Sequence, residues 1–466
     1  MSSPYETKLF INGEYVASRT GERMSLKNPA DGSLVTDDIH VAAEEDVDAA
    51  VAAARAAFPA WSLTAPQQRA VLLNKLADLV EANSEALVQA EVAAGKPKII
   101  AFYGEVQQSA RQLRYYAGWC DKIIGETLPA TEGFLRIVTH EPLGVCAAVC
   151  PFNAPVLMAV AKAGPALAAG NTVIIKPSEK TPLGTLVLGR LASEAGFPPG
   201  VFNIVSGAGS TGALLASHLD IDKISFTGSS STGRRIAEAA ARSNLKRVSL
   251  ELGGKSPAIV FDDANLGVAV EWCIRGITTL TGQICIANSR VYVHKAVKDE
   301  FLKQFKAGLA ATESVTGDPA LDTTMIGPLV DKVQYDRVMS YVEMGKKEAS
   351  LFYGGSGGLA SANSKGYFMQ PVVFVGAGPN ARIVREEIFG PVVVVDEFED
   401  EQDVVARAND SEFGLSSAIF SQDVNRALRV ASKMQSGTVC VNCAVQNQHG
   451  VLSYTETKTT FVKYVA

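Results

Sequence analysis

A cysteine in a polar, threonine-rich stretch is the first residue whose surroundings suggest chemistry. The stretch reads TLTGQICIANSR over residues 279–290 and places Cys285 directly after Gly-Gln-Ile. The chain has seven cysteines, so Cys285 is either an apolar filler, as most of them must be, or a nucleophile. A nucleophilic thiol needs a donor for the developing oxyanion and a base for the step that follows.

Two polar side chains that interrupt apolar runs could supply this support. Asn153 lies between two prolines in CPFNAP, and Glu251 ends an apolar run just before Gly-Gly in SLELGGKSP. Burying an amide without a partner costs about 1–3 kcal/mol, so Asn153 is either paired structurally or placed as a donor. Glu251 is likewise either a structural partner or a general base with a raised pKa.

Two glycine-rich turns each follow a predicted strand and open a predicted helix. FNIVSGAGSTGALLASH contains GxGxxG at Gly207, Gly209 and Gly212, and ISFTGSSSTGRRIAEAA contains Gly228 and Gly233. The N–H groups of a helix N-terminus bind phosphate, so either turn could hold a pyrophosphate. Glycines also serve turns that contact no ligand, and the pattern leaves both alternatives open.

A third stretch, VIIKPSEKTP, ends a predicted strand at Lys176 and continues to Glu179. A carboxylate there could accept hydrogen bonds from both hydroxyls of an adenosine ribose and would repel a 2′-phosphate; the alternative is a solvated loop. Together, the thiol, the amide, the lone carboxylate Glu251 and the two turns fit one reaction class. That class is thiol-assisted hydride transfer from an aldehyde to a nicotinamide.

Composition narrows the function further. The 466 residues, 47% apolar and 20% charged, have room for two or three domains and a large core. A net charge of −6 without a Lys/Arg cluster argues against nucleic-acid binding. The most apolar stretch, residues 144–161, is interrupted by two prolines and Asn153, so we expect a buried core segment and no membrane span.

The remaining cysteines and the histidines predict no further chemistry. The five histidines are scattered, and none has metal-ligand spacing with cysteine or a carboxylate, so no metal is expected. CVNC at 440–443 is interpreted as two thiols of a strand rather than a redox pair. With no basic start followed by an apolar run at the N-terminus, we expect free thiols in a reducing, cytoplasmic compartment.

The pattern of apolar and β-branched residues along the chain predicts an α/β protein with two parallel sheets. Apolar residues repeat at helical spacing over residues 43–61 and 66–95. Short β-branched runs then alternate with helical segments between 140 and 265, and again from 289 to 443. Such alternation is typical of βαβ units.

The chain resembles the NAD(P)-dependent aldehyde dehydrogenase superfamily, and within it the general aldehyde dehydrogenases. Nine motifs occur in the family's order along nearly the whole chain: LRYYAGW, EPLGVC, GPALAAGNTV, KPSEKTP, GFPPGVFNIV, FTGSSSTGR, LELGGKSP, GQIC and EEIFGPV. The resemblance implies oxidation of an aldehyde to a carboxylic acid. Cys285 would form a thiohemiacetal with the aldehyde and then a thioester. The Asn153 amide and the Cys285 N–H would form the oxyanion hole, and Glu251 would activate the water that hydrolyses the thioester.

The resemblance also implies the cofactor site. Lys176 and Glu179 would bind the adenosine ribose, Ser229 would approach the pyrophosphate, and Glu387 would lie by the nicotinamide ribose. Glu179 favours NAD over NADP. The remaining cofactor contacts would be Gly209, Phe226, Gly228, Leu252 and Phe389.

The implied architecture is a Rossmann-like cofactor domain, a second α/β catalytic domain and a small β oligomerisation element. The cofactor domain would comprise residues 1–120 and 143–252, and the catalytic domain residues 253–445. Residues 121–142 and 446–466 would form the oligomerisation strands of a homodimer or homotetramer, since a lone hairpin would expose a sheet edge.

The chain departs from the family's pattern in two places. Thr279 and Leu280 stand where the family has a Phe-Asn pair. Only eleven residues, CAVQNQHGVLS, separate Asn442 from Tyr454, where the family has a longer segment that walls the substrate entrance. The shortening fits an opened pocket, an impaired enzyme, or a specialised or non-catalytic descendant that keeps the fold and the cofactor. NAD-independent ester or thioester hydrolysis through Cys285 is a further alternative.

Overall fold

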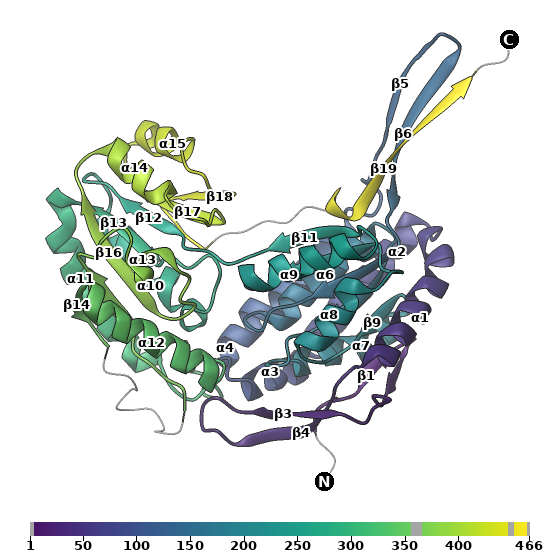
Figure 1. The fold of residues 1–466 in the computed structure, drawn as a ribbon, viewed down its shortest axis with the longest axis horizontal. Coiled ribbons are helices and arrows are strands. Elements are labelled where there is room, and N and C mark those ends of the chain that lie inside the picture. The colour runs from purple at the N-terminus through teal and green to yellow at the C-terminus, as the bar shows by residue number, and fades with distance from the viewer. Residues whose placement is uncertain (1–3, 356–365, 446–451, 464–466) are drawn as a thin grey trace.

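The computed structural model describes residues 4–355, 366–445 and 452–463. Within them lie two seven-stranded sheets, a three-stranded sheet and a two-stranded ribbon of β3 (Arg23–Lys27) and β4 (Leu34–His40). Figure 1 shows the two large sheets with their helices side by side, and the three-stranded sheet projecting from the body.

The first large sheet has the order β11-β10-β7-β8-β9-β1-β2. The five strands from β11 to β9 in this order are parallel, and β1 pairs antiparallel with β9 and β2. The order reverses at β7, which makes the carboxyl end of this strand a topological switch point. The strands are β1 (Leu9–Ile11), β2 (Glu14–Val16), β7 (Val145–Val149), β8 (Thr172–Lys176), β9 (Phe202–Ile204), β10 (Lys223–Thr227) and β11 (Arg247–Glu251).

Helices cover both faces of this sheet because alternate residues of its strands point to opposite sides. Val145, Ala147 and Val149 pack with α1 (Glu44–Ser62), α8 (Gly209–Ser217) and α9 (Ser230–Arg242). The other face packs with α2 (Pro66–Ala82), α3 (Ser84–Ala93), α5 (Gln108–Ala117), α6 (Pro155–Ala168) and α7 (Leu183–Ala195). Between α3 and α5 lie α4 (Lys98–Ile100) and the π-helical turn η1 (Ala101–Gln107).

The second large sheet has the order β14-β15-β16-β13-β12-β17-β18, with β14 antiparallel to the rest. Its strands are β12 (Pro257–Val260), β13 (Arg290–His294), β14 (Ser350–Tyr353), β15 (Val372–Val375), β16 (Val392–Phe398), β17 (Ser416–Phe420) and β18 (Thr438–Val441). Helices α10 (Leu266–Thr278) and α11 (Lys298–Ala311) cover one face. The other carries α12 (Lys332–Glu348), α13 (Arg382–Arg385), α14 (Glu401–Asn409) and α15 (Val424–Ala431).

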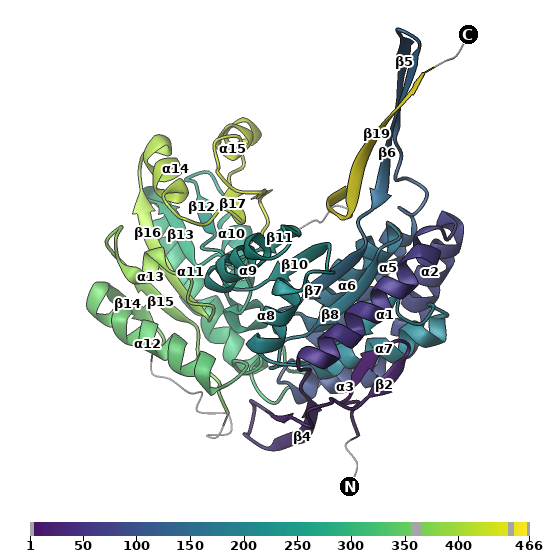
Figure 2. The same ribbon diagram turned by 45° about the vertical axis from the view of Figure 1, so that its right-hand side comes forward.

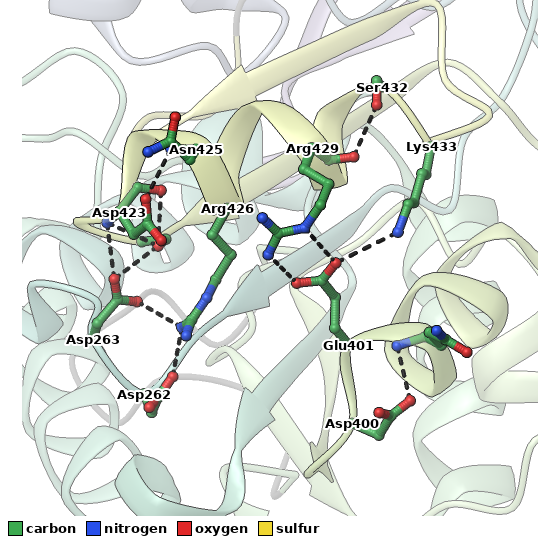
Figure 3. A network of polar contacts seen from close by, with 12 residues as sticks. Asp262, Asp263, Asp400, Glu401, Asp423, Asn425, Arg426, Arg429, Ser432 and Lys433 are labelled. Atoms are coloured by element: carbon green, nitrogen blue, oxygen red, sulfur yellow. Dashed lines mark hydrogen bonds and ion pairs between the residues drawn. The ribbon is translucent and has the colours of Figure 1, made fainter.

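Ion pairs fix the outermost helices of the second sheet. Figure 3 shows Arg426 of α15 pointing between Asp262 and Asp263, with Nη1–Oδ1 distances of 2.6 and 3.1 Å. Arg429, one turn further along α15, pairs with Glu401 of α14 at 2.7 Å. These pairs attach α15 to α14 and to the turn after β12.

The three-stranded sheet has the order β19-β6-β5, with β5 (Glu126–Thr131), β6 (Phe134–Pro142) and β19 (Thr455–Lys463). β19 pairs antiparallel with β6 at nine consecutive positions. Figures 1 and 2 show this sheet as a twisted ribbon leading away from the first large sheet. Every residue of β5 is exposed, so nothing in the described part of the chain covers this edge strand.

Most predicted elements are present, with two differences. The helical repeat over residues 66–95 is broken at Asn83, whose side-chain amide donates to the Leu79 carbonyl at 2.9 Å and ends α2. The alternation predicted between residues 140 and 265 does not stay within one sheet, because its last strand, β12, pairs in the second sheet. Residues 144–161 form a buried strand, a loop and part of a buried helix, as predicted.

Candidate active site

A cleft of about 580 Å³ lies at the carboxyl edge of the first sheet and faces the second. Its volume is within the range of about 300–1,000 Å³ that ligand pockets occupy. Strands β7, β8, β10 and β11 end at this edge, so the residues that follow them converge there. Of the twelve residues singled out from the sequence, eleven line this cleft: Asn153, Lys176, Glu179, Gly209, Phe226, Gly228, Ser229, Leu252, Cys285, Glu387 and Phe389.

Cys285 lies in the loop between α10 and β13, which makes a tight approach to two other backbone segments. Gly254 has no Cβ, and one placed there would lie 2.0 Å from the Cys285 carbonyl oxygen. Gly282, with φ +70°, packs directly on the Gly390 backbone in the same way. The glycines of GGKSP and GQIC therefore allow the close backbone contacts that bring Cys285 into the cleft.

Burial raises the pKa of the Cys285 thiol to about 12, and the nearby Glu387 and Glu251 carboxylates add to the increase. A thiolate in this environment is unfavourable because it loses hydration and faces two negative charges. Both causes favour the neutral thiol over the thiolate in the unliganded protein.

Asn153 follows β7 and points toward the nucleophile loop. Its amide nitrogen donates to the Gln283 backbone carbonyl at 2.9 Å. An amide nitrogen carries two hydrogens, so this bond fixes the side chain and leaves a second N–H for an oxyanion. The buried amide predicted from CPFNAP is thus partnered.

Glu251 is the last residue of β11 and is half-buried beside the cleft, just outside the lining residues. Its carboxylate acts electrostatically on the Cys285 thiol and on the buried Lys162 amine. Burial lowers the pKa of Lys162 to about 8, and its Nζ donates to Ser225 Oγ at 3.0 Å. Glu251 therefore lies within electrostatic range of both the thiol and the buried amine.

Glu387 is held against the Gly-Gly turn of GGKSP. Its Oε1 accepts a hydrogen bond from the Gly254 N–H at 3.0 Å, and a Cβ at Gly253 would lie 2.3 Å from Oε2. Burial raises the pKa of Glu387. Phe389, two residues on, has φ +62° and packs edge-to-face on Phe152 with ring centroids 5.6 Å apart.

Two helix N-termini point into the outer part of the cleft and make it suitable for a pyrophosphate. α8 begins at Gly209, where a Cβ would meet nothing within 4 Å, so the backbone is open to a ligand. α9 begins after Ser229, whose Oγ caps the Thr232 N–H at 3.3 Å. Free N–H groups and the helix dipole attract phosphate at both places.

Lys176 and Glu179 lie at the same end. The Lys176 ammonium is 3.7 Å from the Glu179 carboxylate and donates to the Pro177 carbonyl at 2.9 Å. Lys176 is buried, and burial lowers the pKa of its amine, whereas the Glu179 side chain is 43% exposed. The exposed carboxylate at the cleft wall is available to ribose hydroxyls.

Several residues of the site were missed from the sequence. Gln334 and Arg337 of α12 support the Glu387–Phe389 segment, donating to the Phe389 carbonyl at 2.7 Å and to the Glu387 carbonyl at 2.8 Å. An amphipathic helix pattern gives no signal for such a role. Lys255 of GGKSP is buried, and burial lowers the pKa of its amine to about 7.

Two other sequence predictions can be compared with the described residues. No helix among them is both long and apolar enough to cross a membrane, and no group of three His, Cys, Asp or Glu side chains there could hold a metal ion. The seven cysteines form no disulfide with one another in the described residues, and Cys440 lies in β18 with Cys443 just after it. Of the shortened segment between Asn442 and Tyr454, residues 446–451 lie outside the described residues.

The fold and the site define an α/β oxidoreductase in which a dinucleotide-type cleft leads to a half-buried thiol. The chain belongs to the aldehyde dehydrogenase family, whose sequence profile, "Aldehyde dehydrogenase family", matches residues 15–462. The predictions of this family, of the α/β fold class and of an enzyme acting on aldehydes are confirmed.

Named relatives cover nearly the whole chain. Retinal dehydrogenase 2 of Mus musculus is 47% identical over 442 residues, which is 94% of this chain and 84% of that protein. An aldehyde dehydrogenase of Davidiella tassiana is 45% identical, covering 95% and 88%. Among solved structures, PnpE in complex with nicotinamide adenine dinucleotide has a TM-score of 0.95 at 41% identity, covering 99% and 98% of the two chains. The aldehyde dehydrogenase KauB of Pseudomonas aeruginosa has a TM-score of 0.95 at 38% identity, covering 99% and 97%.

Proposed function

We propose that this chain is an NAD-dependent aldehyde dehydrogenase that releases a free carboxylic acid, with Cys285 as the nucleophile. The observation that carries the proposal is that Cys285 and Asn153 meet at one end of a cleft suited to a dinucleotide, with Glu251 beside the cleft and within electrostatic range of the thiol. Each of these residues admits a structural interpretation alone, whereas their proximity favours a shared reaction.

The residues would act in a fixed order. The Cys285 sulfur, once deprotonated, adds to the aldehyde carbon, and the oxygen that becomes negative accepts hydrogen bonds from the Asn153 amide and the Cys285 N–H. The C–H bond of this carbon would then break, with a bound nicotinamide as the acceptor of the hydride, and the carbon would become an acyl group on sulfur. Glu251 then removes a proton from a water molecule that attacks the acyl carbon on sulfur. The C–S bond breaks, the acid is released, and the sulfur recovers its proton.

The cleft contains the groups that NAD would need. Ser229 and the first turn of α9 would bind the pyrophosphate, and the turn that opens α8 would lie toward the adenine side. Glu387 would accept hydrogen bonds from the nicotinamide ribose. Glu179 would bind the adenosine ribose hydroxyls. A 2′-phosphate would meet the Glu179 carboxylate, so we propose NAD rather than NADP.

We also propose that the three sheets correspond to a cofactor domain, a catalytic domain and an oligomerisation element. β18 is one edge of the second sheet, and β5 is an exposed edge of the three-stranded sheet. Exposed edges are templates for pairing with another chain, so the chain would form a homodimer or homotetramer. Light scattering of the purified protein gives the mass directly, and a monomer at micromolar concentration would contradict this assignment.

The experiment that tests the proposed function follows NADH formation with short aliphatic, long aliphatic and aromatic aldehydes. Wild-type protein should produce NADH and one equivalent of acid. Cys285→Ala should lose turnover while it still binds NAD in calorimetry. NADH production that is unchanged in Cys285→Ala would disprove the assigned mechanism. A preference for large aldehydes would support a pocket opened by the short segment after Asn442.

A further inference from the structure

A closed ring of contacts includes Asn153 and connects the first sheet to the second. It consists of four segments: the Phe152–Asn153 pair after β7, the loop after β8, Gln283 of the nucleophile loop, and the Val330–Asp331 pair just before α12. The proposed catalytic steps do not involve the other residues of this ring, yet the ring holds the Asn153 side chain that would bind the oxyanion.

Gln283 makes one half of the ring. Its backbone carbonyl accepts the hydrogen bond from the Asn153 amide at 2.9 Å. Its side-chain Oε1 accepts another from the Val330 N–H at 3.0 Å. Gln283 therefore connects Asn153 to the residue just before Asp331, which caps α12 by accepting from the Gln334 N–H at 2.8 Å.

Lys180 makes the other half. Its ammonium lies 2.7 Å from the Asp331 carboxylate and 5.1 Å from the centroid of the Phe152 ring. The neighbouring Thr181 hydroxyl donates to the Phe152 carbonyl at 3.2 Å. The loop after β8 thus contacts Phe152 by a cation–π interaction and a hydrogen bond, and the same lysine reaches α12 by charge.

Asn153 needs such a restraint because there is empty space beside it. A cavity of about 40 Å³ is lined by residues of the ring, among them Phe152, Asn153, Gln283 and Val330. A volume of this size accommodates a water molecule or a side-chain shift. A displacement of about 1 Å at a catalytic donor costs on the order of a hundredfold in rate.

We propose that the Lys180–Asp331 ion pair is an interdomain clasp that positions the Asn153 amide for the oxyanion. The proposal rests on the proposed function for the identity of the reaction. Lys180 and Asp331 are positioning residues here, acting through Phe152 and Gln283. The side chains of the pair are 24% and 33% exposed, so salt reaches and weakens the pair.

The test uses Lys180→Gln, Asp331→Asn and the double variant in the full-length protein, with Lys332→Gln as the matched control. Asparagine caps helices as well as aspartate does, so Asp331→Asn removes the charge and keeps α12 capped. Lys332 lies one residue along and pairs with Asp336 on the outside of the helix. We expect kcat at saturating NAD to fall threefold to tenfold in each single variant, with the KM for aldehyde nearly unchanged. The double variant should be no slower than the slower single, because both changes remove one contact.

Two readouts separate this role from others. High salt should lower kcat of the wild type toward that of Lys180→Gln and leave the variants unaffected. Hydrogen–deuterium exchange at the Val330 amide and over residues 150–155 should be faster in both single variants than in Lys332→Gln. Wild-type kcat in both single variants, an additive loss in the double variant, or a loss that disappears as NAD is raised would each overturn the proposal. If wild-type protein makes no NADH while exchange still rises in the variants, the proposed function fails and the clasp stands.

Discussion

The side-chain amide of Asn153 and the backbone carbonyl of Gln283 are joined by a 2.9 Å hydrogen bond, two residues before Cys285. This bond directly connects the strand end of the first sheet to the nucleophile loop, although 130 residues separate the two in sequence. Asn153 is therefore held on the nucleophile loop before any ligand binds, which is the condition for electrostatic preorganisation.

Asn153→Ala should lower kcat for aldehyde oxidation by about 10²–10³, the cost of removing one oxyanion donor. The Kd for NAD should change little, because the amide lies at the inner end of the cleft. Steady-state kinetics and calorimetry on the same preparation give both quantities. A kcat within threefold of wild type would remove Asn153 from the oxyanion hole.

The reactivity of Cys285 should report its raised pKa. Because the thiol has a pKa of about 12, its thiolate fraction, and with it the rate of alkylation by iodoacetamide, should rise about tenfold per pH unit from pH 7 to 9. Glu387→Gln removes a negative charge that raises this pKa, so alkylation at fixed pH should become faster.

Mass spectrometry of the peptide containing Cys285 measures this rate without interference from the other thiols. Glu179→Gln is the control, since Glu179 is not among the groups that raise the pKa of Cys285. A rate that levels off below pH 9 would show that the thiol is already activated in the unliganded protein.

A substitution that relieves backbone strain just before the nucleophile should stabilise the folded protein. Leu280 and Thr281 have φ of +51° and +57°, the left-handed region that asparagine tolerates and that branched side chains avoid. Leu280→Asn should therefore raise stability by about 1 kcal/mol, seen as a higher midpoint in urea. Leu245→Asn is the matched control at an exposed left-handed position with φ +58°. A lower midpoint for Leu280→Asn alone would mean that the packing of Leu280 outweighs the strain.

The sequence predicts the site better than it predicts the site's supports. Apolar runs such as TVIIK and KISFT mark the strands, and the residues that follow them meet because parallel strands end at one edge. Lys180 and Arg337 carry no comparable mark, since their roles depend on which loop of one sheet faces which helix of the other. The break at Asn83 was also not predicted, because the helical repeat continues through it and only a side-chain hydrogen bond ends the first helix.

A buried ion cluster beside the site should matter greatly for stability. The Lys96 ammonium contacts the carboxylates of Glu91, at 2.8 Å, and Glu105, and Glu105 also accepts from the Leu157 N–H at 2.8 Å in the first turn of α6. Lys96→Met leaves two buried carboxylates without a cation, which should cost about 3–5 kcal/mol. Lys98→Met removes an exposed partner of Asp322 and should change little.

The loss in free energy of unfolding caused by Lys96→Met should become smaller as the pH falls. Burial raises the pKa of Glu91, so the folded state holds this proton more tightly than the unfolded state does, and it gains stability as pH falls. The Lys96 charge lowers the pKa of Glu91, so in Lys96→Met that pKa is higher still and the stability gained on lowering the pH is larger. Urea titrations from pH 8 to 5 should show the gap between variant and wild type closing toward pH 5, and a constant gap would show that the lost packing of the lysine, rather than its charge, dominates.

Cofactor choice should depend on Glu179. Its carboxylate is 43% exposed at the cleft wall and lies 3.7 Å from the buried Lys176 ammonium. A 2′-phosphate placed beside it would face a like charge, whereas in Glu179→Gln the same phosphate would face a neutral amide and the Lys176 cation. We therefore expect kcat/KM with NADP to rise about tenfold in this variant. With NAD it should fall severalfold, because the amide accepts ribose hydrogen bonds less strongly than a carboxylate does. Lys332→Gln, outside the cleft, controls for nonspecific effects of mutation. An unchanged ratio of the two kcat/KM values would place the adenosine ribose elsewhere, and the two helix N-termini at Gly209 and Ser229 would then have to fix the cofactor without Glu179.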